Sequence, residues 1–221
     1  MIQFNFPTVL LFGENSVNEL PSVIKKKNLN RLLLVTDPGL MKIGLADDVR
    51  EKLISAGLDI KIFDGVHPNP LEEDVTFGVK AYQSGDYDGI IALGGGSAMD
   101  VAKTIRFMVV HQPPLSQYDD AIGGDTKIIN PLPPLFAIPT TAGTGSEVGR
   151  SSVITMKQTG RKTIFFHPGL MPEIAILDPI LTVGLPPHIT AATGMDAFSH
   201  CLEAYLWTVF TPWQMQSQLK G

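Results

Sequence analysis

The chain has 221 residues, of which 44% are hydrophobic and 18% are charged, and its formal net charge is -5. These values are typical of one folded domain with part of a second, and they exclude a disordered chain. The acidic balance provides no basic face, so we expect no nucleic-acid partner. No apolar run approaches the roughly 20 residues of a membrane span, and the N-terminus has no secretory pattern. We therefore expect no membrane partner.

A single cysteine, Cys201, excludes an internal disulfide and fits a reducing compartment. Together with the missing secretory pattern, this predicts a cytoplasmic protein. We expect the Cys201 side chain to be buried, because free cysteines usually behave as small apolar groups.

The first half of the chain alternates between strand and helix patterns. Residues 2–12 predict short strands interrupted at Pro7, and residues 13–27 predict a helix with Asn15 or Ser16 as its cap and with Pro21 as a point where it can break or kink. The other expected elements of this half are strands over 31–36, 59–63 and 90–93 and helices over 45–56 and 74–85. Strands and helices in this order predict parallel pairing through right-handed crossovers.

Three consecutive glycines, Gly94, Gly95 and Gly96, separate the apolar run at 90–93 from a helix expected over 97–110. Glycine has no Cβ, so a ligand can approach the backbone closely. We expect Ser97 to cap the helix and Asp100 to reach back to the Ser97 amide. The unpaired amides favour a phosphate, although a tight turn without a ligand explains the same residues.

Two other polar segments follow expected strands. Asp37 comes directly after residues 31–36, where a carboxylate can accept from a ribose hydroxyl and repel a 2′-phosphate; Asp-Pro-Gly is also an ordinary turn. Residues 139–147 follow a strand over 135–138 and include several threonines. Their hydroxyls suit a phosphate, a ribose or a nicotinamide amide, and a flexible connection is the alternative.

The second half predicts a hairpin, a strand and a long helix, over residues 151–166, 174–177 and 188–207 respectively. Lys162 in the hairpin either reaches a cofactor or faces solvent. Asp196 and His200 lie four residues apart, so they share one helix face and can hold one cation between them. Such a pair is more often a surface pair than a metal site.

These blocks together resemble the iron-containing (group III) alcohol dehydrogenases. The resemblance is carried by Gly94 to Ser97 with Asp100 and Lys103, residues 139–147, residues 177–179 and residues 192–205. It runs from residue 2 to about residue 207 in the family's order. It implies an α/β fold in which a Rossmann-like parallel sheet with flanking helices forms a dinucleotide-binding domain at residues 1–184. Residues 185–221 would then begin an all-helical metal-binding domain.

The resemblance also implies roles for individual residues. Gly95, Gly96 and Ser97 would bind the pyrophosphate of NAD, and Asp37 would select NAD over NADP. The residues that would line the ribose region are Thr140, Thr141, Thr144 and Lys162. Asp196 and His200 would be catalytic as two of the family's four metal ligands, for Fe(II) or alternatively zinc. By this resemblance the metal binds the oxygen of a small alcohol or aldehyde, and hydride passes between its carbon and nicotinamide.

The family continues into a long helical domain that supplies two further histidine ligands. This sequence ends at Gly221, has no histidine after His200, and departs from the family pattern over residues 208–221, so we expect a C-terminally truncated or a frameshifted product. Three hypotheses stay open: a dehydrogenase with impaired activity, an NAD-binding protein without metal chemistry, and a non-catalytic partner subunit of a full-length relative. An exposed apolar face would favour a homo-oligomer.

Overall fold

The structure, a computed structural model, describes residues 8–206. Its strands are β1 (Val9–Phe12), β2 (Arg31–Val35), β3 (Asp59–Phe63), β4 (Gly89–Gly94), β5 (Leu135–Pro139), β6 (Ser151–Thr155), β7 (Lys162–Phe166) and β8 (Ile174–Leu177). Its α-helices are α1 (Leu20–Lys26), α2 (Pro38–Lys42), α3 (Leu45–Ser55), α4 (Glu72–Gln83), α5 (Gly96–Met108) and α6 (Pro187–Leu206). The strands and helices expected over residues 31–108 are thus confirmed.

Six of the strands form one parallel sheet in the order β1-β8-β5-β4-β2-β3, and β6 and β7 form a separate antiparallel hairpin. The sequence order reverses between the neighbouring strands β2 and β4, because β2 is followed by β3 on one side and β4 by β5 on the other. Such a reversal is the topological switch point of a doubly wound sheet, where ligands bind beyond the carboxyl ends of the strands.

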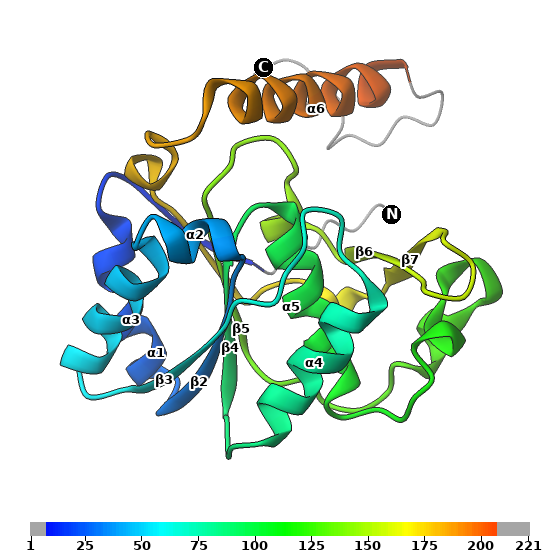
Figure 1. The fold of residues 1–221 in the computed structure, drawn as a ribbon, viewed down its shortest axis with the longest axis horizontal. Coiled ribbons are helices and arrows are strands. Elements are labelled where there is room, and N and C mark those ends of the chain that lie inside the picture. The colour runs from blue at the N-terminus through cyan, green and yellow to red at the C-terminus, as the bar shows by residue number, and fades with distance from the viewer. Residues whose placement is uncertain (1–7, 207–221) are drawn as a thin grey trace, which may run out of the picture.

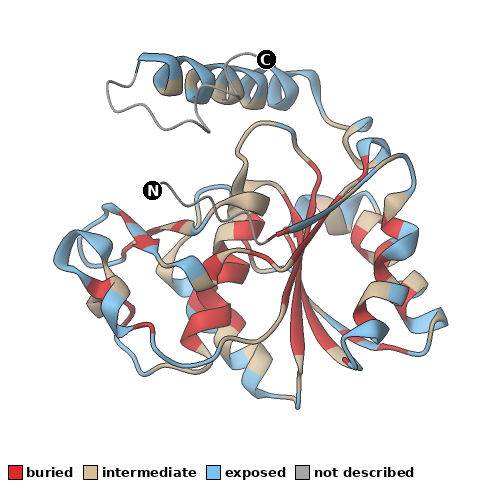
Figure 2. Ribbon diagram, turned by 180° about the vertical axis from the view of Figure 1, so that it is seen from behind, coloured by how far each residue is buried: buried red, intermediate tan, exposed pale blue. Residues whose placement is uncertain are grey.

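Helices cover both faces of the sheet because the strand residues alternate between two apolar cores. Leu33 and Val35 pack with residues of α4 and α5, whereas Leu32 and Leu34 pack with residues of α1 and α3. Figure 1 shows these two helical layers on opposite sides of the sheet, and Figure 2 shows the buried residues concentrated in the strands and α5. The expected Rossmann-like parallel sheet with flanking helices is therefore confirmed.

The single helix predicted over residues 13–27 is wrong. Residues Ser16–Glu19 form a 3-10 turn, and α1 begins only at Leu20, with Pro21 in its first turn. Asn15 has a φ of 60° and caps nothing with its side chain. Instead, the buried Asp178 carboxylate accepts from the amides of Asn15 at 3.0 Å and Val17 at 3.2 Å. A cap supplied from 161 to 163 residues away cannot be seen in the local pattern.

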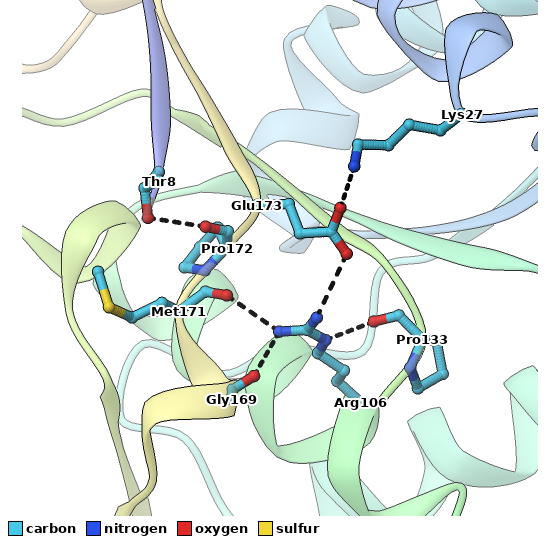
Figure 3. A network of polar contacts seen from close by, with 8 residues as sticks. All are labelled: Thr8, Lys27, Arg106, Pro133, Gly169, Met171, Pro172 and Glu173. Atoms are coloured by element: carbon cyan, nitrogen blue, oxygen red, sulfur yellow. Dashed lines mark hydrogen bonds and ion pairs between the residues drawn. The ribbon is translucent and has the colours of Figure 1, made fainter. Parts of the chain in front are cut away.

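Polar contacts tie the elements together at the amino ends of the strands (Figure 3). The buried Arg106 of α5 donates through one terminal nitrogen to the carbonyls of Gly169 at 2.6 Å and Met171 at 3.0 Å. Its Nε donates to the carbonyl of Pro133, and its other terminal nitrogen lies 3.8 Å from Glu173, which also pairs with Lys27. These contacts fix the amino edge of the sheet.

Helix α6 lies across the carboxyl end of the sheet, above the loop that follows β5 (Figure 1). None of its residues is buried, and Cys201 is exposed, so the expectation of a buried cysteine is wrong. No helix among residues 8–206 combines the length and apolar character needed to cross a membrane. The departure from the family pattern predicted for residues 208–221 lies outside the described residues.

Candidate functional site

The glycine-rich turn lies at the switch point of the sheet. Gly94 ends β4, and Asp37 follows the neighbouring strand β2 by two residues. A Cβ built on Gly94 would lie 3.5 Å from Oδ2 of Asp37, so this carboxylate faces the turn. Gly95 occupies the N-cap position of α5, and no side chain caps the helix there. The first amides of α5 are therefore free to bind an anion.

The loop after β5 faces the glycine turn at short range. A Cβ on Gly95 would lie 3.3 Å from both Cγ2 and Oγ1 of Thr141, and one on Gly96 would lie 3.0 Å from Cγ2 of Thr144. The amide of Thr140, a buried residue, donates to the carbonyl of Gly94 at 3.0 Å and so anchors this loop to the turn. The two glycines and the threonines thus face each other across a narrow space, which a side chain on either glycine would fill.

Two buried hydroxyl groups that follow strands of the sheet lack hydrogen bonds among the described residues, and one of them, on Thr141, faces the glycine turn. Oγ1 of Thr141 and Oγ1 of Thr36 are both buried and have no partner among the described residues. A buried hydroxyl without a partner is costly, by about 1–3 kcal/mol. Thr141 therefore faces the glycine turn with an unused hydrogen-bonding group, and a ribose or phosphate ligand would satisfy it.

The expected capping by Ser97 and Asp100 is wrong. Ser97 lies inside the first turn of α5, and its hydroxyl donates to the carbonyl of Pro68 at 2.7 Å. Asp100 turns away from the helix start and accepts from Ser146 and from the amide of Val153. The extra glycine lets α5 begin one residue before Ser97, and this frees Ser97 to tie the turn to the segment after β3.

The two carboxylate oxygens of Asp37 have different surroundings: one caps a helix, and the other faces the glycine turn. Oδ1 accepts from the amides of Gly39 at 2.8 Å and Leu40 at 3.1 Å, which caps the short helix α2. Oδ2 faces Gly94 and makes no hydrogen bond among the described residues. The ordinary-turn interpretation and the ribose interpretation of Asp37 are therefore compatible.

Lys162 has no recorded contact with the residues around the glycine turn among residues 8–206. It is exposed at the start of β7, and its ammonium has no hydrogen bond or ion pair within residues 8–206. It pairs across the hairpin with Thr155, which forms a bridge with Leu71 in the segment that follows β3. The hairpin end that carries Lys162 is thus attached to the same segment that Ser97 contacts.

A buried polar network beneath the turn was missed by the sequence analysis. Lys103 is fully buried in α5, and its Nζ donates at 2.9 Å to both Oγ of Ser146 and the carbonyl of Ser151. Ser146 in turn donates to Asp100 at 2.8 Å. Burial lowers the pKa of Lys103 to about 8, against the attraction of Asp100. The sequence feature that could have revealed this network is the pair Asp100 and Lys103, which lie three residues apart and so on one face of the helix.

Asp196 and His200 lie on one face of α6, with Oδ1 and Nε2 separated by 3.8 Å. Their side chains are 45% and 55% exposed. No group of three or more metal-ligating side chains gathers anywhere in residues 8–206. Two ligands are fewer than iron or zinc sites use, so the described residues alone do not fit a complete metal centre.

Helix α6 touches the threonine loop at one glycine. A Cβ on Gly143 would lie 2.2 Å from the carbonyl oxygen of Thr193, one turn before Asp196. Only a residue without a side chain allows this approach. The metal-ligand pair and the threonine loop are therefore linked through a direct backbone contact.

The parallel sheet with helices on both faces defines a Rossmann-like α/β protein, and the glycine turn lies at its switch point, the edge where such sheets bind ligands. A sequence profile of the iron-containing alcohol dehydrogenases matches residues 7–179, and the chain therefore belongs to this family. Choline dehydrogenase of Bacillus subtilis (strain 168) is 40% identical over 202 residues, which are 91% of this chain and 50% of that protein.

Solved structures agree with this assignment. A 1,3-propanediol oxidoreductase is 39% identical with a TM-score of 0.89, over 96% of this chain and 55% of that one. A sulfoacetaldehyde reductase of Bifidobacterium kashiwanohense, solved in complex with NAD+, is 29% identical with a TM-score of 0.85, also over 96% and 55%. The chain spans about half the length of the curated relatives it matches.

Proposed function

We propose that this chain is the NAD-binding part of an NAD-dependent, metal-dependent alcohol dehydrogenase. The observation that carries the proposal is the unpaired, buried Thr141 hydroxyl, which faces Gly95 across a space that a Cβ would fill. The similarity to a reductase solved with NAD+ supports the choice of cofactor. The domain division at residues 184 and 185 belongs to this proposal, supported by the absence of buried residues in α6.

Each predicted cofactor residue receives a role that agrees with its position. The amides of Gly95, Gly96 and Ser97 bind the pyrophosphate at the start of α5. Oδ2 of Asp37 accepts from the adenosine ribose and repels the 2′-phosphate of NADP. Thr141 uses its free hydroxyl on the cofactor.

The remaining cofactor residues border the same space. Thr144 lines the side opposite Gly96, while Thr140 holds the loop against β4. Lys162 approaches from the hairpin as a mobile cation, because its long exposed side chain is unpaired. Bound NAD supplies a hydride acceptor at nicotinamide, and these residues orient it.

The proposed substrates are small alcohols and aldehydes. Relatives of this chain carry names that refer to choline, 1,3-propanediol and sulfoacetaldehyde, which have short carbon skeletons, although another is named a long-chain-alcohol dehydrogenase. Asp196 and His200 are proposed as two ligands of Fe(II), or alternatively of zinc. Since the described residues provide no third ligand, dehydrogenase activity depends on ligands supplied from elsewhere.

The experiment compares binding and turnover in the same preparation. Fluorescence titrations with NADH and NADPH should give saturable binding of NADH and much weaker binding of NADPH. NAD reduction is then followed with short alcohols under anaerobic conditions with added Fe(II). Absence of NADH binding would refute the proposal, whereas binding with turnover that His200→Ala abolishes would support its full form.

A second candidate, NAD binding without turnover, is favoured by the exposure of Asp196 and His200 on α6. Saturable NADH binding with no turnover under any metal would establish it. The same helix exposes Met195, Phe198 and Leu202, and this apolar face supports a homo-oligomer; light scattering that finds only monomers would contradict self-association. A cytoplasmic location is also proposed, from the single cysteine.

A further inference from the structure

Lys103 is a lysine side chain with no exposed surface. Lysines are almost never fully buried unless they are paired, because removing an ammonium from water is costly. The glycine turn and the threonine loop account for cofactor contacts without this residue. Its burial beneath them therefore calls for a separate explanation.

The ammonium of Lys103 and the carboxylate of Asp100 share one hydroxyl group. Ser146 accepts from Nζ of Lys103 at 2.9 Å and donates to Oδ1 of Asp100 at 2.8 Å. Nζ also donates to the carbonyl of Ser151, and Oδ2 of Asp100 accepts from the amide of Val153 at 3.1 Å. Two side chains of α5 thus hold the backbone from residue 146 to residue 153.

The same contacts continue to the glycine turn. The amide of Ser146 donates to Oγ1 of Thr144 at 3.3 Å, and Cγ2 of Thr144 is the atom that faces Gly96. Gly96 and Lys103 belong to one helix, about two turns apart. Helix α5 therefore contributes the anion-binding amides at its start. Two turns later it contributes Lys103, whose ammonium holds Ser146 and through it the threonine loop opposite Gly96.

We propose that Lys103 is a positioning residue for NAD, which places Thr144 opposite Gly96 through Ser146 and whose protonation is coupled to cofactor binding. This inference rests on the proposed function. It assigns Lys103 no contact with the cofactor or substrate. Its effect passes through Ser146 and through its positive charge beneath the pyrophosphate site.

The charges around Lys103 determine the direction of the pH dependence. Burial lowers its pKa to about 8, while Asp100 on the same helix and Glu147 on the loop raise it and Arg106 lowers it further. Lys103 consequently loses its proton as the pH rises through about 8. Because the pyrophosphate is negative, its binding favours the protonated lysine, so affinity should fall above this pH and binding should take up protons.

The experiment measures NADH affinity from pH 7.5 to 9.5 in the full chain and in Lys103→Met, Ser146→Ala and Thr104→Val. The wild-type affinity should fall roughly ten-fold across this range. Lys103→Met should bind roughly ten-fold more weakly at pH 7.5 and show no further fall. Calorimetry in buffers of different ionisation enthalpy should show proton uptake by the wild type near pH 8.5, and none by Lys103→Met.

Two variants separate positioning from general support of the fold. Ser146→Ala removes only the shared hydroxyl on a half-buried loop residue, so it should weaken NADH binding several-fold and, because two buried charges lose a partner, also lower the melting temperature. Thr104→Val removes the neighbouring contact of α5 with Ser152 and should lower stability while keeping the pH profile. If NADH binds the wild type but Lys103→Met and Ser146→Ala keep its affinity and pH profile, the inference fails. If the wild type binds no NADH, the proposed function fails instead.

Discussion

Helices α5 and α6 each carry a block of the family pattern, but they differ in how far their residues are buried. Ten of the 13 residues of α5 are buried, whereas none of the 20 residues of α6 is. Helix α5 packs against the sheet, the hairpin and α4, so its start is held rigidly beneath the glycine turn. Helix α6 meets the threonine loop near Thr193 and leaves both predicted metal ligands exposed.

This difference indicates that the two halves of the proposed chemistry depend on different parts of the chain. Cofactor binding draws on backbone amides, glycines and hydroxyls that the sheet fixes in place. Metal binding draws on side chains of one helix and needs further ligands. The residues of the proposed cofactor site are therefore already gathered among the described residues, whereas those of the proposed metal site are not.

The largest expected effect compares one aromatic residue from each helix. Phe107 in α5 is fully buried against Tyr118 and Phe165, so Phe107→Ala should destabilise the protein by about 3–5 kcal/mol. Phe198 in α6 is 60% exposed, so Phe198→Ala should stay within about 0.5 kcal/mol. Urea denaturation gives both values. Equal losses would show that α6 is packed as firmly as α5.

The next effect concerns cofactor affinity. Gly95→Val would place its side chain against Thr141 and cover the helix amides, and it should weaken NADH binding by roughly 100-fold. Asp196→Ala, on α6, should leave NADH affinity unchanged. Fluorescence titration measures both variants. Loss of NADH binding in Asp196→Ala would show that α6 belongs to the cofactor site.

A smaller effect is expected at Asp37, where two variants distinguish the role of its charge in cofactor preference from its role as a helix cap. Asp37→Asn keeps a good helix cap but removes the charge, so stability should hold while the preference for NADH over NADPH falls roughly ten-fold. Asp37→Ala should lose the same preference and also about 1 kcal/mol of stability, because α2 loses its cap. Paired titrations and denaturation curves distinguish these outcomes. An unchanged preference in Asp37→Asn would remove Asp37 from cofactor selection.

The smallest effect is expected at the metal-ligand pair. With two exposed ligands, zinc should bind with an affinity on the order of 10 µM or weaker, and His200→Ala should abolish this binding. NADH affinity should be the same with and without zinc. Calorimetry with zinc measures the affinity. Nanomolar binding would mean that further ligands complete the site.

The sequence predicted the sheet well because its central strands are continuous apolar runs between turn residues. Leu32 to Val35 and Ile90 to Leu93 are buried on both sides, and this pattern is local. The glycine turn and the threonine loop were also found, since glycine and hydroxyl residues at strand ends signal a ligand edge.

The parts that were missed depend on contacts between distant residues. Asp178 caps the segment after β1 from 161 residues away, and Ser146 joins Asp100 from 46 residues away. Ser97 bonds to Pro68 rather than to its own helix. None of these partners can be inferred from spacing along the chain. They decide where caps form and which polar groups remain free for a ligand.

Gly143 determines how closely helix α6 approaches the threonine loop that follows β5. A Cβ at this position would lie 2.2 Å from the carbonyl oxygen of Thr193, so only glycine fits between the threonine loop and this carbonyl. Gly143→Ala would place a methyl group against the carbonyl of Thr193 and push α6 away from the threonine loop. The side chains of Asp196 and His200 would stay unchanged. The missing Cβ of Gly143 thus sets how closely the threonine loop approaches the helix that carries the two proposed metal ligands.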